Sequence, residues 1–213
     1  MKKRLILLIL ISQYTFADSP LISTTFFKAY MDVPLVNKTA KSNGVLTNEV
    51  FDYLNLKSNT IDKKIALINA LKWSVKGKNN AALYLKRLFV IHKEYSIKNF
   101  FNKGTAEQLI CYAYLKAMDN YFDVETALKF ATQATKRNSN SYTIALINQL
   151  IKCQTISHIE WCEIYRVMNE TRENKKLVID FRKQASNIIF NYTDCYKEYC
   201  TNWYFIKKFI QNK

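Results

Sequence analysis

Hydrophobic residues between Thr105 and Lys136 recur every three or four positions, the spacing that places them on one face of a helix. Thr105 and Gln108 have the spacing of a capping box, so a first helix is predicted to begin there. Asp123 is the predicted N-cap of a second helix. The two apolar faces are rich in small residues: Ala106, Leu109, Ile110, Ala113 and Ala117, then Val124, Ala127, Leu128, Ala131 and Ala134. Because small residues let helices approach closely, we predict a tight antiparallel hairpin.

Two segments of the chain nearly repeat one another. Ile65–Leu71 and Ile144–Leu150 match at six of seven positions, 79 residues apart. Helices predicted at 61–75, 105–118 and 141–153 are each followed by another helix-like stretch, which gives a period of roughly 40 residues, typical of stacked helix pairs. The alternative is that a sequence rich in Ile, Leu and Asn repeats by chance.

The second helix of the central pair resembles that of a tetratricopeptide-like repeat. Ala127, Ala131 and Ala134 carry the likeness, with polar residues 138–140 after the helix. No proline closes the repeat, and other residues stand where that family has Trp-Leu-Gly: Cys111, Tyr114 and Leu115. The resemblance implies an all-α fold of stacked antiparallel helix hairpins forming a short solenoid, with a generic binding role. It assigns no functional residue.

Turn-forming residues are scarce, which favours the same fold class. The chain has three glycines and two prolines, and both prolines precede residue 40. Sandwiches and barrels need turn residues throughout, so residues 60–213 are predicted to form a helical-repeat domain after an irregular segment with short helices at 18–59. Within these regions, Thr47 is a predicted N-cap, Gly77 a predicted C-cap of the helix at 61–75, and Asn80 the start of its partner helix.

The first 17 residues read as a cleaved export signal. A basic start, Met1–Arg4, precedes an apolar run that ends in small residues, with cleavage expected after Ala17. No later stretch reaches the roughly 18 apolar residues that a membrane span needs, so no stable membrane insertion is predicted. We therefore expect a bacterial periplasmic or secreted protein. An uncleaved anchor at the membrane surface is the alternative.

The net charge of the chain indicates which class of partner to expect. The whole chain has a net charge of +15, and removal of Lys2, Lys3 and Arg4 leaves +12. Few of the basic residues are arginine and none forms a long basic run, so nucleic-acid binding is not predicted. A field of this sign favours an acidic protein partner, and the attraction would weaken with salt.

Five cysteines remain after the predicted cleavage, in a compartment that permits disulfides. We predict a bond between Cys195 and Cys200, provided that a break in the helix brings their Cα atoms within about 7 Å. For Cys153 and Cys162, a bond across the turn competes with buried free thiols. The odd number leaves at least one cysteine, such as Cys111, unpaired or bonded to another chain.

Metal and cofactor chemistry has little support. His158 and Cys162 lie four residues apart on one predicted helix face, but a zinc site would need a further ligand that the local sequence does not supply. No metal or cofactor is therefore predicted.

Catalysis is also poorly supported. Neither histidine, His92 or His158, lies near a nucleophile motif, and no glycine loop could cradle phosphate. Glu160 and Glu163, beside Trp161, are the candidates for a peptidoglycan-acting enzyme, which needs one glutamic acid with a raised pKa. Glu160 also completes a capping box with Ser157, which explains it without catalysis. We assign no catalytic residue.

The C-terminal region is dense in aromatic residues that would either cover the last helices or form a binding surface: Tyr192, Tyr196, Tyr199, Trp203, Tyr204, Phe205 and Phe209. The leading expectation is a non-enzymatic helical-repeat protein that binds a protein partner in the cell envelope, in one version an immunity protein against a periplasmic toxin. The alternatives are a peptidoglycan-acting helical enzyme and a structural envelope component.

Overall fold

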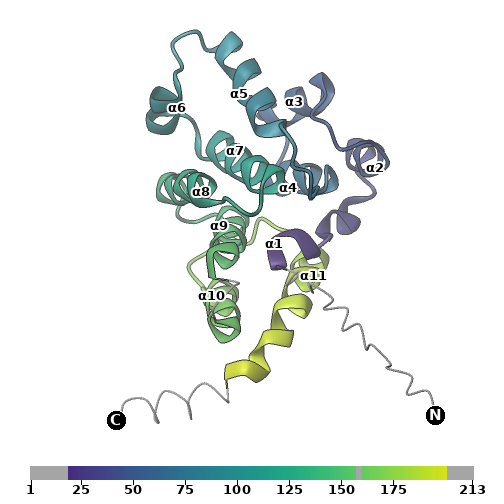
Figure 1. The fold of residues 1–213 in the computed structure, drawn as a ribbon, viewed down its shortest axis with the longest axis vertical. Helices are drawn as coiled ribbons and strands as arrows, with labels where there is room; N and C mark the ends of the chain where they lie inside the picture. The colour runs from purple at the N-terminus through teal and green to yellow at the C-terminus, as the bar shows by residue number, and fades with distance from the viewer. Residues whose placement is uncertain (1–18, 157–159, 201–213) are drawn as a thin grey trace, which may run out of the picture.

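The computed structural model describes residues 19–156 and 160–200, and the regular structure of these residues is helical (Figure 1). One isolated bridge, between Ser141 and Val178, is the only β-pairing among them. This confirms the all-α class. The helices are α1 (Pro20–Ser23), α2 (Pro34–Ala40), α3 (Asn48–Asn55), α4 (Ile61–Ala70), α5 (Asn80–Ile91), α6 (Ile97–Lys103), α7 (Ala106–Asp119), α8 (Glu125–Arg137), α9 (Tyr142–Ile156), α10 (Trp161–Glu173) and α11 (Lys183–Thr193), with 3₁₀ helices η1 (Phe26–Tyr30) and η2 (Asp194–Lys197).

Some predictions fall outside the described residues. These are the export signal at 1–17, Ser157 with its cap, His158, and the last part of the aromatic tail: Trp203, Tyr204, Phe205 and Phe209.

Helix α7 lies at the centre of the molecule and packs against α4, α5, α8 and α9. Every residue from Leu109 to Leu115 is buried, so the helix is covered on all sides. The capping box predicted at its start is present: the Thr105 hydroxyl accepts from the Gln108 N–H, and the Gln108 side chain accepts from the Thr105 N–H. The strongest local signal in the sequence therefore marks the helix on which the others pack.

Helix α8 returns along α7 and also contacts α9, and α9 in turn packs against α10. The predicted alanines, Ala127, Ala131 and Ala134, are buried. The predicted cap is wrong by one position, because α8 begins at Glu125 with Val124 as its N-cap and Asp123 lies in the turn before it.

Helix α4 ends earlier than predicted. Its last residue is Ala70, Lys72 adopts a left-handed conformation with φ of 59°, and Gly77 belongs to a later turn. The Lys78 ammonium donates to the carbonyls of Leu71 and Lys72, at 2.5 and 2.9 Å, and so satisfies the helix end in place of the predicted glycine cap.

The start of α5 at Asn80 is confirmed. A carboxylate from another helix caps it: Asp119, at the end of α7, accepts from the Ala81 N–H at 2.7 Å. The Thr47 cap of α3 is also present, since its hydroxyl accepts from the Val50 N–H.

The two nearly identical segments lie on α4 and α9, which both pack against α7, yet their asparagines differ. Asn69 is buried and makes three hydrogen bonds: it accepts from the Phe27 N–H at 2.9 Å and donates to the Thr24 carbonyl at 3.1 Å and the Tyr114 hydroxyl at 2.8 Å. Asn148 is half-buried and accepts one long hydrogen bond, 3.5 Å, from Thr132. Asn69 therefore joins the N-terminal segment to α4 and α7.

The N-terminal segment, residues 19–33, is part of the core. Its helix α1 packs against α9, and η1 packs against α4 and α11 (Figure 1). Phe26 stacks on Tyr114 with ring centroids 6.3 Å apart and meets Phe181 edge-on at 5.5 Å. The segment therefore fills the space beside α4, α7 and α9.

Arg182 fastens this segment to the start of α11. Its guanidinium forms two hydrogen bonds with the Asp32 carboxylate, at 2.5 and 3.0 Å, and one with the Ala29 carbonyl at 2.8 Å. The Arg182 N–H also donates to the Tyr30 hydroxyl. A second pair, Arg172 with Asp194, joins α10 to η2 at 2.7 and 3.0 Å.

Replacing Asn69 should destabilise the fold much more than replacing Asn148. Asn69→Ala removes three buried hydrogen bonds and leaves their partners unsatisfied, at an expected cost of about 3 kcal/mol in the free energy of unfolding, whereas Asn148→Ala should cost less than about 1 kcal/mol. Equilibrium urea unfolding measures both. Equal losses would contradict the role of Asn69.

Stability should also fall in acid. The guanidinium groups of Arg182 and Arg172 lower the pKa of Asp32 and Asp194. Such carboxylates contribute stability that is present above their unfolded pKa, about 4, and is lost as the pH falls through the folded pKa. We expect urea unfolding to show a smaller loss between about pH 4 and pH 2 in the double variant Asp32→Asn, Asp194→Asn than in the wild type.

Asp119 provides a control, because its effect on the pH dependence of stability has the opposite sign. Burial raises the pKa of Asp119, so its contribution to stability increases as the pH falls. Asp119→Asn should therefore steepen the loss of stability in acid, and a shallower loss would contradict this account.

Candidate functional site

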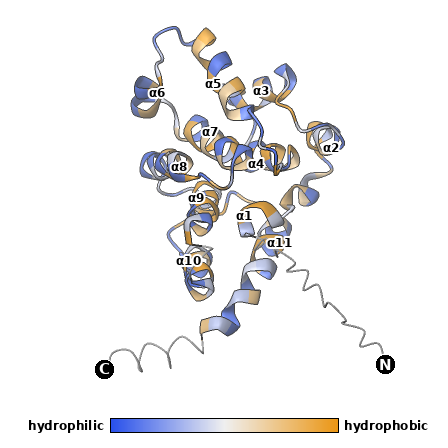
Figure 2. Ribbon diagram, in the orientation of Figure 1, coloured by the Kyte–Doolittle hydropathy of each residue, from blue (hydrophilic) through white to orange (hydrophobic). Residues whose placement is uncertain are grey.

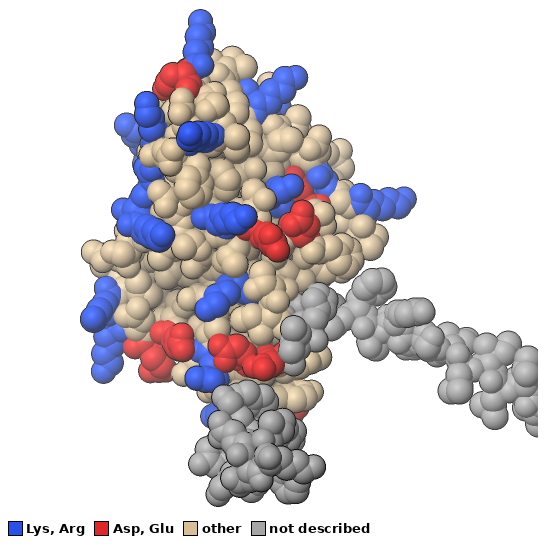
Figure 3. All heavy atoms as spheres, turned by 60° about the vertical axis from the view of Figure 1, so that its left-hand side comes forward, with Lys and Arg blue, Asp and Glu red and all other residues tan. Residues whose placement is uncertain are grey.

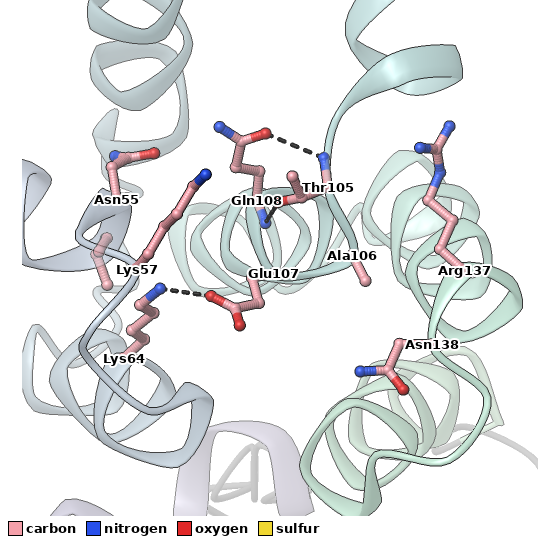
Figure 4. Close-up of a pocket in the computed structure, with 10 residues that line it drawn as sticks. Asn55, Lys57, Lys64, Thr105, Ala106, Glu107, Gln108, Arg137 and Asn138 are labelled. Carbon is pink, nitrogen blue, oxygen red and sulfur yellow. Dashed lines mark hydrogen bonds and ion pairs between the residues drawn. The ribbon is translucent and has the colours of Figure 1, made fainter.

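A pocket of about 520 Å³ opens at the N-terminal end of α7, between the end of α3 and the start of α4 on one side and the end of α8 on the other (Figure 4). Four helices and their loops contribute its lining: Leu54, Asn55, Lys57, Lys64, Thr105, Ala106, Glu107, Gln108, Arg137 and Asn138.

Lys64 is the most constrained charged group of the pocket. Its side chain is 2% exposed, and its ammonium pairs with the Glu107 carboxylate at 2.5 Å, which is 43% exposed. A buried ammonium needs such a partner, because an unpaired charge away from water is costly. The pair therefore presents the open side of the Glu107 carboxylate to the pocket and holds the ammonium beneath it.

The other cations lie on opposite walls. Lys57 follows α3 and is exposed, and Figure 4 shows its side chain on the same side of the pocket as Lys64. Arg137, at the end of α8, donates to the carbonyls of Gly104 and Asn102 and thereby holds the end of α6 against α8.

The electrostatics of this pocket favour an anionic group. Three cationic side chains and one carboxylate line it, and the N-terminus of α7 adds a partial positive charge. Glu107 is the only acid among the lining residues, so they contain no pair of carboxylates for acid–base chemistry. The arrangement can hold a carboxylate of a partner by ion pairing.

Sequence analysis missed this pocket because its residues come from four separate helices. One signal was available: Lys64 stands at helical spacing from Ile61, Ile68 and Leu71, and so lies on a helix face that is otherwise hydrophobic. A lysine in such a position requires a partner, and the sequence does not say which.

The glutamates considered for catalysis lie elsewhere. Helix α10 begins at Trp161, and Glu160 is its N-cap residue without a side-chain capping bond, so Glu160 does not take the third helical position that the predicted capping box gives it. Glu163 forms an ion pair with Arg166 at 3.3 Å on the surface of α10.

The disulfide differs from both predicted pairs. Cys162 of α10 bonds to Cys200, with Cα atoms 4.7 Å apart, across 38 residues of sequence. The predicted bonds between Cys195 and Cys200 and between Cys153 and Cys162 do not form. Cys195 and Cys200 share a continuous run of 3₁₀ and α-helical turns that separates them, and Cys153 is buried in α9.

Three cysteines are free: Cys111 and Cys153, both buried, and Cys195, which is exposed. Burial raises the pKa of Cys111 and of Cys153 to about 12, so both thiols stay protonated at neutral pH.

Aromatic side chains gather beside the disulfide. Trp161 lies 5.2 Å from Tyr196 and 5.3 Å from Tyr199, between ring centroids. Tyr196 is buried, whereas Trp161 and Tyr199 are 39% and 43% exposed. The described part of the aromatic region thus joins the end of the chain to α10 and also leaves two rings partly open.

Cationic side chains cover much of the surface. On the face in Figure 3, Lys and Arg are spread widely, and Asp and Glu gather in a few groups. Within residues 19–156 and 160–200, no helix is long and apolar enough to cross a membrane, and no three His, Cys, Asp or Glu side chains lie together as metal ligands.

Comparison of the chain with protein-family models, with curated proteins and with solved structures finds no match. The pocket, the charge and the fold are therefore the grounds for a functional proposal.

The disulfide gives a prediction that thiol labelling can check. In native protein isolated without reductant, maleimide should label Cys195 and spare Cys111 and Cys153, because both are buried and protonated. In urea all three should react. Peptide mapping should recover Cys162 linked to Cys200. Recovery of Cys195 linked to Cys200 would contradict the structure.

Proposed function

We propose that this protein is an exported, non-enzymatic helical-repeat protein that binds an acidic protein partner in the cell envelope. The observation that carries the proposal is the pocket at the N-terminus of α7, which three cations and one carboxylate line. Lys64 is already paired with Glu107, so a carboxylate of the partner would enter there and pair with the exposed Lys57.

The arrangement of the helices supports a repeat architecture. Helices α7 to α10 pack each on the next, and α4 and α9 both pack against α7. The first expected pair departs from this pattern, because α5 packs chiefly against α7 and not against α4. On this proposal the stack is a short tetratricopeptide-like solenoid. The N-terminal segment fills the space beside its first helices, so the partner uses the ends and outer faces of the stack.

The net charge and the predicted export signal support the choice of an acidic partner and of the cell envelope. A net charge of +12 on the chain without its first 17 residues attracts acidic surfaces, and export to the periplasm places the protein where an acidic toxin from a neighbouring cell would arrive. An immunity protein that occludes such a toxin is the specific form of the proposal. Normal growth of a deletion strain exposed to toxin-producing kin would contradict this form.

Affinity capture tests the general proposal. Full-length protein carrying a C-terminal tag, produced in its own host and isolated from the envelope, should retain an acidic protein at low salt and release most of it at high salt. Lys57→Glu, at the pocket, should reduce the captured amount about tenfold. Lys152→Glu makes the same change in charge at an exposed position of α9 and should reduce it far less.

Either of two results would contradict the proposal. One is the absence of any stoichiometric partner at low salt. The other is an equal effect of Lys57→Glu and Lys152→Glu, because that would assign binding to net charge and not to the pocket.

A further inference from the structure

A second concave surface lies between α3 and α5. It exposes apolar side chains and contains an arginine that lacks a hydrogen-bond acceptor among the described residues. The groove has a volume of about 410 Å³. Its residues come from the two helices alone: Asn48, Phe51 and Asp52 from α3, and Leu83, Lys86, Arg87, Val90 and Ile91 from α5.

The hydrophobic side chains at the lip of the groove are unusually exposed to solvent. Val90 and Ile91 are 71% and 61% exposed, and Val90 has the largest exposed fraction of the large hydrophobic side chains in the described residues. In Figure 2 the end of α5 is coloured as strongly hydrophobic. Because Phe51 and Leu83 continue the apolar surface into the groove, the patch is contiguous, as protein-binding patches are.

The second unusual feature of the groove, besides its exposed apolar lip, is Arg87. Its Nη1 atom is buried, and its guanidinium donates no hydrogen bond to any described residue. The group lies over the Phe51 ring, with Cζ 5.9 Å from the ring centroid. Asp52 lines the same groove, and yet the two form no ion pair within the described structure.

An arginine of this kind requires an acceptor from outside the chain. Buried donors in folded proteins nearly always have a partner, and a guanidinium has five N–H groups arranged to hold a carboxylate with two parallel bonds. The cation–π contact with Phe51 holds the guanidinium in place. The groove therefore offers a fixed site for one carboxylate next to a site for aliphatic side chains.

We infer that this groove receives an amphipathic segment of the acidic partner protein, with its aliphatic side chains on Val90 and Ile91 and one Asp or Glu carboxylate on Arg87. The inference rests on the proposed function, because it names a segment of the same partner. The apolar floor and lip select a protein segment as the occupant, because a polymer that carries a charge on every unit would place charges against them.

Site-specific photocrosslinking tests this inference in the full-length protein. Val90→p-benzoylphenylalanine places the probe at the lip of the groove, and Val178→p-benzoylphenylalanine is the matched control, since Val178 is 63% exposed and lies in the loop before α11. Position 90 should crosslink to the captured partner, and mass spectrometry should place the adduct in a segment where Asp or Glu stands among aliphatic residues. Position 178 should give at least about tenfold less adduct.

Affinity measurements on a synthetic peptide of the crosslinked segment then test the role of Arg87. The peptide should bind about tenfold more tightly than its counterpart with Glu→Gln or Asp→Asn, and Arg87→Gln should remove that difference. Arg166→Gln, which changes an exposed arginine of α10, should preserve it. Ile91→Ser should weaken both peptides alike.

The outcomes separate the two proposals. If wild-type protein captures a partner but position 90 gives no adduct, or if Arg87→Gln leaves the peptide difference intact, the groove is not the docking site and the proposed function stands. If wild-type protein captures no partner, the proposed function fails and this inference fails with it.

Discussion

The fold depends on covering α7 from every direction. A helix with buried residues around its whole circumference cannot be stable in water, and one neighbouring helix can cover only one side of it. Helices α4, α5, α8 and α9 supply most of the cover, and Phe26 of the N-terminal segment completes it against Tyr114. Among the polar groups brought inside by this arrangement, three form hydrogen bonds with the Asn69 side chain.

This packing determines which concave surfaces of the molecule remain open. The side of α4, α7 and α9 that is nearest the N-terminal segment is occupied by buried residues of that segment, including Phe26 and Tyr30. The pocket at the end of α7 and the groove between α3 and α5 are left open. At both places the structure holds a cation that the interior constrains, Lys64 through Glu107 and Arg87 through Phe51. A fixed cation loses little conformational freedom when it binds a carboxylate, which favours specific over diffuse attraction.

Features set by neighbouring residues were predictable from the sequence, and features set by distant residues were not. The capping box of Thr105 and Gln108 and the cap at Thr47 depend on side chains three residues apart, and both are present. Gly77 was assigned to the end of α4 because glycine commonly takes that position, but the ammonium of Lys78 satisfies those carbonyls. In the same way, Cys162 bonds to a cysteine 38 residues away because α10 packs against the end of the described chain. The pocket and the groove were missed for this reason, since each needs helices whose neighbours no local pattern specifies.

The contacts of Arg182 bear on how the chain acquires its structure during synthesis. Tyr30 and Asp32 precede Arg182, which bonds to both of them, by 150 or more positions. Phe26 likewise contacts Phe181, so the packing of the N-terminal segment stays incomplete until residues 181 and 182 have been made. Contacts of such long sequence separation slow folding and prolong the exposure of apolar residues. The contacts between the N-terminal segment and residues 181–182 are therefore among the late contacts of the core.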